Sequence, residues 1–245
     1  MGLNISKTGT MPRYYQLREI IRERIVSGQW KEDDEIPSER ELSEKYGLSR
    51  MTVRQSLSEL VKEGLLYRKQ GRGTFVSRPK ITQQLIRLTG FTQDMQTRSQ
   101  RPGAKVLSAE MYVADQIVAD KLRINLGRQV FKLRRLRLAD GEPLAVELAY
   151  ISFIGCEKLL EEDFERDSLY QVLETKYGLL PLEAEQELEA GIAREAECRL
   201  LNIAPGSPVL LIRRFTYTER AQPFEYAESV YRGDKYKFYA RLVRE

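Results

Sequence analysis

The sequence predicts an α+β protein of two domains, a winged helix-turn-helix followed by a domain built on one β-sheet. Three observations support this prediction: the order of helix and hairpin signals in residues 1–78, an internal repeat later in the chain, and an excess of positive charge confined to the first part. The chain has 245 residues, of which 42% are hydrophobic and 31% charged. This composition is typical of a globular protein, and the length suits two small domains.

The first two helices are predicted from apolar periodicity and from capping residues. Between Pro12 and Gly28, apolar residues recur every three to four positions, as on the buried face of an amphipathic helix. Ser38 and Glu41, three positions apart, form a capping box that starts a second helix. We expect this helix to end at Gly47.

A third helix and a hairpin complete the first domain. Ser49 is the predicted N-cap of a helix that stops at Gly64, a residue suited to the left-handed conformation. Two short apolar segments, 65–67 and 74–76, then flank the glycine-containing tip 71–73, which predicts a β-hairpin. A basic hairpin after a helix-turn-helix is a wing. The alternative is a small helical domain with an unrelated surface hairpin, and the order and charge of the elements favour the wing.

Residues 79–101 are polar with few structural signals, so we expect a linker there; strands dominate residues 102–245. This later region contains a repeat with a spacing of 79 positions. The recurring residues are Leu122, Ile124, Gly127, Val130, Arg134 and Arg135, matched by Leu201, Ile203, Gly206, Val209, Arg213 and Arg214. Each copy predicts a short helix, a glycine turn, a long strand, a turn with a proline and a second strand. Two such copies can pair into one sheet with helices on a face.

Composition excludes several classes of enzyme. The sequence has no histidine, which removes Ser-His-Asp and Cys-His catalysis and most zinc sites. Its two cysteines, Cys156 and Cys198, are far apart and predict buried thiols rather than a redox or metal motif. Neither a phosphate loop nor a dinucleotide fingerprint is present, so we expect no cofactor and no metal.

Two further absences bear on location. No apolar run approaches the roughly 18 residues of a membrane span, and the amino terminus lacks the pattern of a secretory signal. We therefore expect a cytoplasmic protein without membrane association.

The charge distribution indicates a polyanionic partner for the first domain. Up to Arg78 the chain has 15 Lys and Arg against 11 Asp and Glu, whereas the remainder has 25 of each. The net charge of +4 therefore lies entirely in the first 78 residues. A local basic excess of this kind is the electrostatic signature of nucleic-acid binding.

The third helix carries the residues best placed to contact bases. Arg50 and Arg54 are four positions apart and share a helix face, with Ser49 and Thr52 at the amino end. The amino end of a recognition helix reaches base edges in the major groove, where an arginine can donate two hydrogen bonds to guanine. Arg40, in the first turn of the preceding helix, is a further candidate. The alternative for these arginines is solvated surface ion pairs.

The tip of the hairpin is the second predicted DNA contact. Gly71 and Arg72 could enter the minor groove, whose narrow, negative channel favours a small backbone and a cation.

The second domain contains a candidate anion site. Arg135 and Arg137 are two positions apart on a predicted strand and project from one face, as suits a phosphate or carboxylate. The second repeat copy has Thr216 in place of Arg137, which indicates a binding site rather than a requirement of the fold. Ser168 with Gln171 predicts a capping box at another helix start, a further position for an anion. The alternative is an exposed basic strand and an ordinary cap.

Segments Pro37–Leu42, Ser49–Arg54 and Gly71–Val76 together resemble the GntR family of winged-helix bacterial transcription regulators. Segments Leu88–Thr92, Arg135–Gly141 and Tyr231–Asp234 resemble the HutC branch of that family, and in particular the NagR/DasR group of amino-sugar regulators. The resemblance implies a winged-helix DNA-binding domain at 1–78, a linker and transmitter segment at 79–101, and a UTRA effector-binding and dimerisation domain at 102–245. It also implies that this last domain has a chorismate-lyase-like α+β fold with an antiparallel sheet.

The resemblance further implies a homodimeric repressor of amino-sugar (N-acetylglucosamine) utilisation genes. Such a repressor binds an inverted-repeat operator in double-stranded DNA and is released by glucosamine 6-phosphate or N-acetylglucosamine 6-phosphate. The alternative effector is another small metabolite, either a different sugar phosphate or a carboxylate. Two other hypotheses, a lyase-like enzyme using Glu147 and Glu225 and an architectural DNA-binding protein, lack support because histidine is absent and a dedicated DNA-reading unit is present.

The family's site residues map onto numbered positions here. The resemblance places DNA contacts at Arg40, Arg50, Arg54 and Gly71, which agrees with the choice from helix geometry. In the effector domain it implies that phosphate is held by Arg135, Arg137, Ser168 and Tyr170, that sugar hydroxyls or the amino group meet Glu147, Glu225 and Tyr231, and that Phe91 lines the pocket. The alternative for the two carboxylates is surface acid on a strand.

Overall fold

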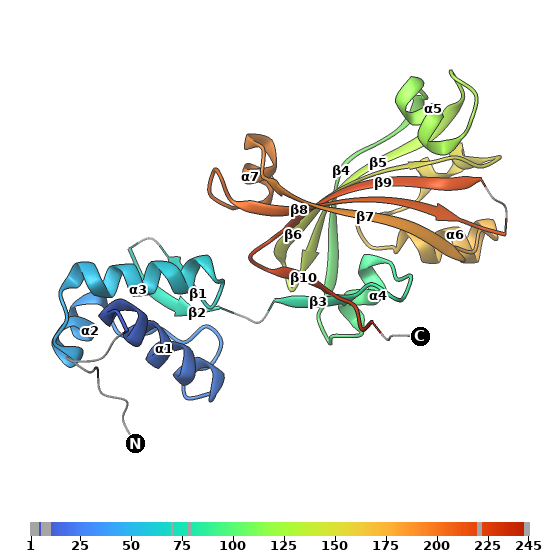
Figure 1. The fold of residues 1–245 in the computed structure, drawn as a ribbon. Helices are drawn as coiled ribbons and strands as arrows, with labels where there is room; N and C mark the ends of the chain where they lie inside the picture. The colour runs from blue at the N-terminus through green and yellow to red at the C-terminus, as the bar shows by residue number, and fades with distance from the viewer. Residues whose placement is uncertain (1–4, 6–10, 70, 78–79, 220–221, 243–245) are drawn as a thin grey trace. The chain divides into compact units, whose positions relative to one another are not determined.

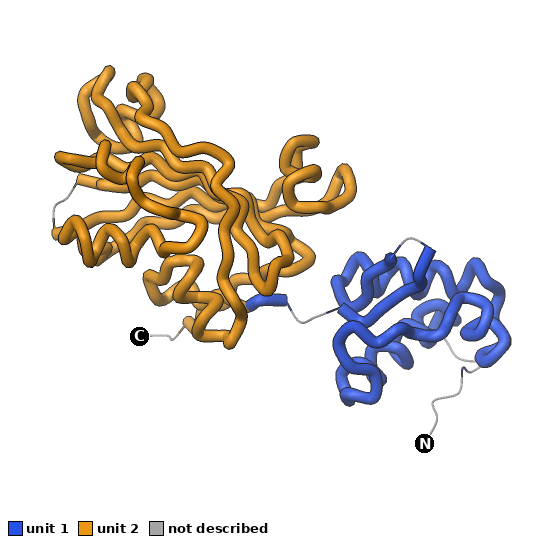
Figure 2. Tube along the Cα trace, turned by 180° about the vertical axis from the view of Figure 1, so that it is seen from behind, with its two compact units in different colours: residues 1–81 blue, residues 82–245 orange. Residues whose placement is uncertain are grey.

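The computed structural model describes residue 5 and residues 11–69, 71–77, 80–219 and 222–242. The chain divides into two units, residues 1–81 and 82–245, each described here by itself (Figure 2). The predicted boundary between the first domain and the linker, at residues 78 and 79, lies outside the described residues.

The first unit contains the predicted helices and hairpin (Figure 1). Its elements are α1 (Arg13–Val26), α2 (Glu39–Tyr46), α3 (Arg50–Lys62), β1 (Leu66–Lys69) and β2 (Gly73–Val76). The two strands pair antiparallel, with Leu66 opposite Val76. The helix-turn-helix and the wing are therefore both confirmed.

Local capping chemistry fixes the ends of these helices. The Ser38 hydroxyl accepts from the Glu41 amide, and the Glu41 carboxylate accepts from the Ser38 amide at 2.8 Å, so the capping box is confirmed. Gly47 has a φ of 63°, the left-handed conformation in which α2 ends. The Ser49 hydroxyl accepts from the Thr52 amide and starts α3. These caps set the tight turn between α2 and α3.

One apolar core joins the helices of the first unit to its wing. Its fully buried members include Leu17 and Ile21 of α1, Leu57 of α3, and Leu66 and Val76 of the wing. Burying an aliphatic side chain of this size stabilises a fold by about 1.5–3 kcal/mol. This core packs the recognition helix α3 against α1 and the wing.

The second unit is built on a six-stranded sheet in the order β4-β5-β6-β9-β8-β7, in which all neighbours are antiparallel (Figure 1). The strands are β4 (Pro102–Val113), β5 (Gln129–Ala139), β6 (Glu142–Ile151), β7 (Glu183–Ile192), β8 (Pro208–Tyr217) and β9 (Pro223–Arg232). The remaining elements are β3 (Ile81–Gln84), α4 (Phe91–Gln96), α5 (Gln116–Leu122), the 3-10 helix η1 (Cys156–Glu161), α6 (Leu169–Tyr177), α7 (Glu195–Leu201) and β10 (Tyr236–Tyr239). The predicted α+β fold with an antiparallel sheet is confirmed.

The repeat found in the sequence is the structural unit of this sheet. The order β4–α5–β5–β6 recurs as β7–α7–β8–β9, and the two copies meet where β6 pairs with β9, with Ala149 opposite Ala227. Leu122 and Leu201, equivalent residues in the two copies, are both fully buried. Each copy also has a strand before its helix, which the repeat in the sequence did not predict.

The two faces of the sheet are covered differently. Helices α5 and α7 pack on one face: Leu122 belongs to an apolar cluster with Val130, and Leu201 belongs to another with Leu136. The 3-10 helix and α6 pack on the other face against Phe131 and its neighbours. Because side chains alternate along a strand, the odd-numbered residues of β5 face the η1 and α6 side.

The segment predicted as a linker contains two regular elements. β3 pairs with β10, and α4 buries Met95 completely. Four-residue strands and a six-residue helix have too few positions for a periodic signal, so the sequence pattern did not predict them. Apart from residues 80 and 81, the described part of this segment belongs to the second unit.

Three findings concern features predicted from composition. Cys156 and Cys198 are free and buried, as predicted. In the described ranges, no cluster of three Asp, Glu or Cys side chains could hold a metal ion. None of the described helices combines the length and apolarity needed to cross a membrane.

Candidate functional site

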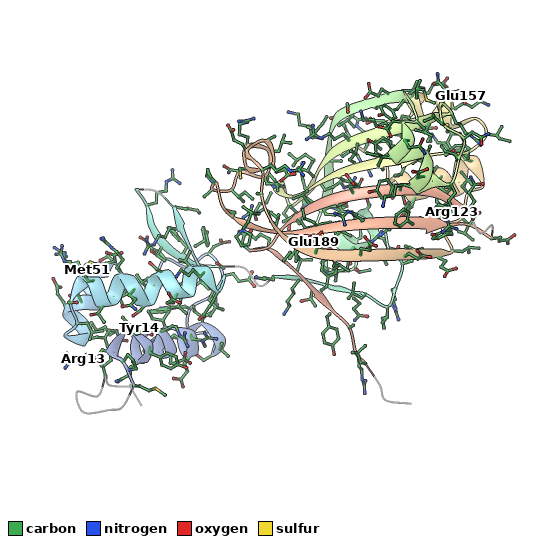
Figure 3. All side chains as sticks on the ribbon, turned by 45° about the horizontal axis from the view of Figure 1, so that its top comes forward. Arg13, Tyr14, Met51, Arg123, Glu157 and Glu189 are labelled. Carbon is green, nitrogen blue, oxygen red and sulfur yellow. The ribbon has the colours of Figure 1, made fainter. Side chains whose placement is uncertain are left out.

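The solvent-facing side of α3 presents the arginines predicted to contact DNA. Arg50 is exposed at the first position of the helix, and Arg54, one turn later, has a side chain 57% exposed. Met51 lies beside them, 70% exposed, and projects from the outer face of α3 (Figure 3). An exposed apolar side chain next to two cations suits contact with a thymine methyl group. The sequence analysis did not select Met51.

Two of the three arginines predicted to contact DNA from the helices form ion pairs within the unit. Arg54 contacts Glu39, with its Nη2 atom 3.0 Å from Oε2, and Arg40 lies 3.8 Å from the carboxylate of Glu44. For Arg50 the described residues provide no ion-pair partner. Exposed ion pairs are worth about 0–1 kcal/mol, so a phosphate or a base can replace the long Arg40–Glu44 contact at little cost.

The wing tip and the start of α3 complete the candidate DNA surface. Gly71 has a φ of 72°, which an L side chain rarely adopts, and Arg72 beside it is exposed. Lys69 lies on the arm of the hairpin, with its ammonium 4.8 Å from the Phe75 ring centre. Thr52 shares a hydrogen bond with the capping hydroxyl of Ser49. All seven predicted DNA-binding residues therefore belong to α2, α3 and the wing.

The second unit contains a pocket on the sheet face that carries α6. The region of the pocket spans about 630 Å³, open solvent included. Its lining residues are Gln83, Thr89, Gly90, Phe91, Arg135, Arg137, Glu147, Ser168, Leu169, Tyr170, Ile212, Arg214, Glu225, Ala227, Ser229, Tyr231 and Tyr236. The structure thus brings together all eight residues that the sequence assigned to an effector, from five different elements and the loops beside them.

One wall of the pocket is an ion pair between neighbouring strands. Arg135 of β5 lies opposite Glu147 of β6 and donates to its Oε1 atom from Nε at 3.1 Å and from Nη2. Burial raises the pKa of Glu147, but Arg135 and Arg137 outweigh burial, so the pKa lies below its usual value. Glu147 is therefore a carboxylate at neutral pH.

Arg137 is buried, and no carboxylate in the described part of the chain bonds to it. Its Nη2 atom donates to the Thr92 hydroxyl at 3.1 Å, and its guanidinium lies 4.5 Å from the Phe91 ring centre. Burial, together with the nearby charge of Arg135, lowers the pKa of Arg137 to about 10. Neither Arg137 Nε nor Arg135 Nη1 has a hydrogen-bond partner among the described residues, although both atoms are buried.

The opposite wall holds the second carboxylate. Glu225 of β9 accepts hydrogen bonds at Oε2 from Tyr170 at 2.7 Å and from Thr216 at 2.6 Å. Burial raises the pKa of Glu225 above its usual value, although these hydrogen bonds and Arg214 oppose the rise. Tyr231, six positions farther along β9, also lines the pocket; its ring lies 4.6 Å from that of Tyr236, and burial raises its pKa to about 12.

Ser168 is the N-cap residue of α6, but its side chain makes no capping hydrogen bond. The predicted capping box with Gln171 is therefore wrong. Ser168 lines the pocket, and its hydroxyl forms no hydrogen bond with an amide at the start of α6. The sequence pattern marked the helix start correctly but could not show where the side chain points.

A third arginine, Arg214, lines the pocket and was not among the predicted site residues. It donates from Nη1 to the Thr89 carbonyl at 3.2 Å and from Nε and Nη2 to the side-chain oxygen of Gln186 at 2.9 and 2.7 Å. Arg214 is the residue in the second repeat copy that corresponds to Arg135, so the repeat in the sequence could have predicted Arg214 as a site residue.

The two repeat copies build complementary halves of the pocket. Arg135 has Glu147 opposite it in the sheet, whereas its equivalent Arg214 has Ala227. Two residues farther along each strand, Arg137 of β5 lies opposite Ala145 in the first copy. At the equivalent place in the second copy, Thr216 of β8 lies opposite Glu225. Three guanidinium groups thus meet two carboxylates, and the excess positive charge, with its unpaired N–H groups, fits an anionic ligand.

Comparison with known proteins agrees with both units. Residues 13–76 match the model of bacterial regulatory proteins of the gntR family, and residues 97–237 match the UTRA domain. The HTH-type transcriptional repressor NagR of Bacillus subtilis (strain 168) is 44% identical over 237 residues, 96% of this chain and 97% of that protein. The histidine utilization repressor of Pseudomonas putida is 33% identical over 236 residues, 96% of this chain and 94% of that protein.

A solved structure shares the architecture. The crystal structure of PhnF from Mycobacterium smegmatis matches with a TM-score of 0.66 and 28% identity, covering 93% of this chain and 99% of that one. Both the winged helix and the pocket-bearing unit therefore have counterparts in known regulators. The chain belongs to the GntR family of bacterial regulatory proteins with a UTRA effector domain, and it is a transcriptional repressor of the GntR/HutC type rather than an enzyme.

Proposed function

We propose that this protein acts in the cytoplasm as a homodimeric repressor of amino-sugar utilisation genes, and that glucosamine 6-phosphate or N-acetylglucosamine 6-phosphate releases it from an inverted-repeat operator. The observation that carries this proposal is the pair of buried, unpartnered N–H groups on Arg135 and Arg137 beside two carboxylates. Buried donors without partners cost folding free energy, and an anionic ligand would satisfy them. The resemblance to amino-sugar regulators supplies the ligand class.

The pocket offers a distinct role to each end of such a ligand. Arg135, Arg137 and the free hydroxyl of Ser168 suit the phosphate, with Phe91 lining the pocket beside Arg137. Glu147, Glu225 and Tyr231 suit the sugar hydroxyls and the amino group, because carboxylates accept directional hydrogen bonds. Tyr170 already donates its proton to Glu225, so it can donate to a phosphate only if the ligand displaces that bond.

On the DNA side, the proposal assigns base contacts to Arg40, Arg50 and Arg54 and minor-groove entry to Gly71 and Arg72. Ser49 and Thr52 would contact the backbone at the start of α3. A single winged helix offers few contacts, so useful affinity requires two copies on half-sites. We assign the dimer contact to residues 102–245 and the transmission of ligand binding to residues 79–101.

A second candidate effector is a different anionic metabolite. Three arginines would also hold a carboxylate, and the 33% identical relative is named a histidine utilization repressor. The proposed coupling is reciprocal in either case: if the ligand lowers the affinity for operator by some factor, operator lowers the affinity for the ligand by the same factor.

The experiment compares melting temperature and operator release with four compounds: the two amino-sugar phosphates, glucose 6-phosphate and unphosphorylated glucosamine. A ligand that binds only the folded state raises the melting temperature. We expect the two amino-sugar phosphates to raise it and to release operator, and Arg135→Ala to abolish both effects. Arg134→Ala is the matched control, because Arg134 is half-buried on the opposite face of the same strand. No response to either amino-sugar phosphate would remove the effector class.

The assembly is tested by light scattering of the full-length protein. We expect a dimer at micromolar concentration. A monomer bound to a single half-site with full affinity would contradict the homodimer.

A further inference from the structure

We propose that Glu39 is a positioning residue for DNA reading, which holds Arg54 so that one edge of its guanidinium stays free for a base or a phosphate. The proposal rests on the DNA-reading role proposed above for Arg54. Glu39 was not among the residues that the sequence singled out as DNA-binding.

Glu39 joins three elements of the first unit. As the first residue of α2, it receives hydrogen bonds from Arg54 of α3: Nε lies 3.2 and 3.1 Å from its two oxygens, and Nη2 lies 3.0 Å from Oε2. Its Oε1 atom also lies 3.6 Å from Nη2 of Arg68 on β1. One carboxylate therefore links the helix before the turn, the recognition helix and the wing.

The chemistry of the guanidinium explains why this contact leaves Arg54 competent to read DNA. Arginine has five N–H donors in a planar fork. Glu39 takes the Nε and Nη2 edge, which leaves the Nη1 protons and one Nη2 proton unused by Glu39. That remaining edge is suited to a two-bond contact with guanine O6 and N7 or with phosphate oxygens.

Exposure is consistent with this division. The Glu39 side chain is 27% exposed, whereas that of Arg54 is 57% exposed. The carboxylate is thus more shielded from water than the cation it holds. By contrast, Arg40 Nε lies 3.8 Å from Glu44 Oε1, beyond hydrogen-bond distance, and both of those side chains are 70% exposed. Among these described pairs, Arg54 alone is held by a two-bond contact.

Two effects of Glu39 on DNA binding have opposite signs. Its negative charge repels any polyanion, so it weakens binding to all sequences alike. Its contact with Arg54 fixes a flexible side chain before DNA arrives, which favours the one sequence that matches that geometry. Removing the carboxylate should therefore strengthen non-specific binding and weaken discrimination, a combination that a loss of folding would not produce.

The test compares the affinities of full-length Glu39→Gln for two probes, a duplex selected from a random pool by the wild type and the unselected pool. We expect the ratio of the two affinities to fall about tenfold, in line with the discrimination of one good arginine–guanine contact. Glu59→Gln is the control, because Glu59 lies on α3 in an ion pair with Lys62 and carries the same charge. Its affinity ratio should stay unchanged.

A double-mutant cycle shows whether Glu39 acts through Arg54. In the Arg54→Ala background, adding Glu39→Gln should leave the ratio unchanged. An equal loss in both backgrounds, or no loss in Glu39→Gln alone, overturns the proposal. Glu39→Asp keeps the charge but shortens the reach, and it should lose discrimination without gaining non-specific affinity. If Arg54→Ala itself leaves discrimination unchanged, the DNA-reading role assigned to Arg54 is what has failed.

Discussion

Arg54 on the recognition helix exposes more than half of its side chain, whereas Arg135 and Arg137 in the pocket are each only 3% exposed. The exposed arginines stay hydrated in the free protein and meet their anion at a surface. The buried ones lose their water when the chain folds, which costs free energy unless a partner replaces it. In our proposal, the same side chain therefore serves a large external polyanion in one unit and a small enclosed anion in the other.

The largest expected effect comes from removing both buried cations of the pocket. Arg135→Ala with Arg137→Ala should abolish operator release by the amino-sugar phosphates, since two charge-assisted donors contribute about 1.5–3 kcal/mol each. Operator affinity without ligand should stay nearly unchanged, because neither residue lies in the first unit. Titration of operator release in wild type and variant measures this. Equal release by both proteins would remove the site assignment.

The exposed arginines should show a smaller effect of a different kind. We expect Arg50→Ala to weaken operator binding by about 1–3 kcal/mol and to relax preference at one base pair per half-site. Lys69→Ala, on the hairpin arm, should weaken all sequences alike and lower the salt dependence. Affinities of both mutants for a set of operator variants distinguish the base-specific contact from the sequence-independent one. If Arg50→Ala left their ranking intact, α3 would not read bases through this residue.

Burial predicts that an arginine of the pocket destabilises the free protein. The pKa of Arg137 is lowered to about 10 from 12.5, so folding disfavours its charged form. That cost is fully present below pH 10 and is lost as pH rises from 10 to 12.5. Arg137→Met should therefore raise the free energy of unfolding by on the order of 1 kcal/mol at neutral pH. Chemical denaturation without ligand measures the free energy of unfolding of both proteins. A destabilised variant would contradict the prediction and show that Arg137 is needed for packing.

The smallest effect concerns the pH dependence of stability. The pKa of Glu225 is raised by burial, so the folded state holds this proton more tightly than the unfolded chain does. Stability then falls as pH rises from about 4.5 through the folded pKa. Glu225→Gln cannot bind this proton, so the melting temperature of the wild type should fall relative to that of the variant as pH rises from about 4.5 to 7. Parallel melting curves across this range would contradict the prediction.

Local signals in the sequence predicted the first unit almost completely. The box of Ser38 and Glu41 and the left-handed Gly47 depend on neighbours within a few positions, so the sequence contains their full cause. The placement of Arg135 and Arg137 on one face follows from the alternation of a strand and needs no tertiary information.

The residues missed in the second unit depend on distant partners. Arg214 acquires its setting from the Thr89 carbonyl, 125 positions away, and from an alanine where its equivalent has a glutamate. Gln83 lines the pocket and accepts a hydrogen bond from Tyr236, 153 positions later. No local sequence pattern predicts pairs of residues this far apart. The setting of Ser168 also depends on distant residues, so only the folded structure shows that it lines the pocket.

The pairing of β3 with β10 has a consequence for synthesis on the ribosome. β3 ends at Gln84, directly after the winged helix, but its partner begins only at Tyr236. At translation rates of about 5–20 residues per second, roughly 8–30 s pass between the emergence of the two strands. The DNA-binding unit can fold during that interval, while the stretch that follows it waits for the end of the chain. The β3–β10 pairing can therefore form only after nearly the whole chain has been synthesised.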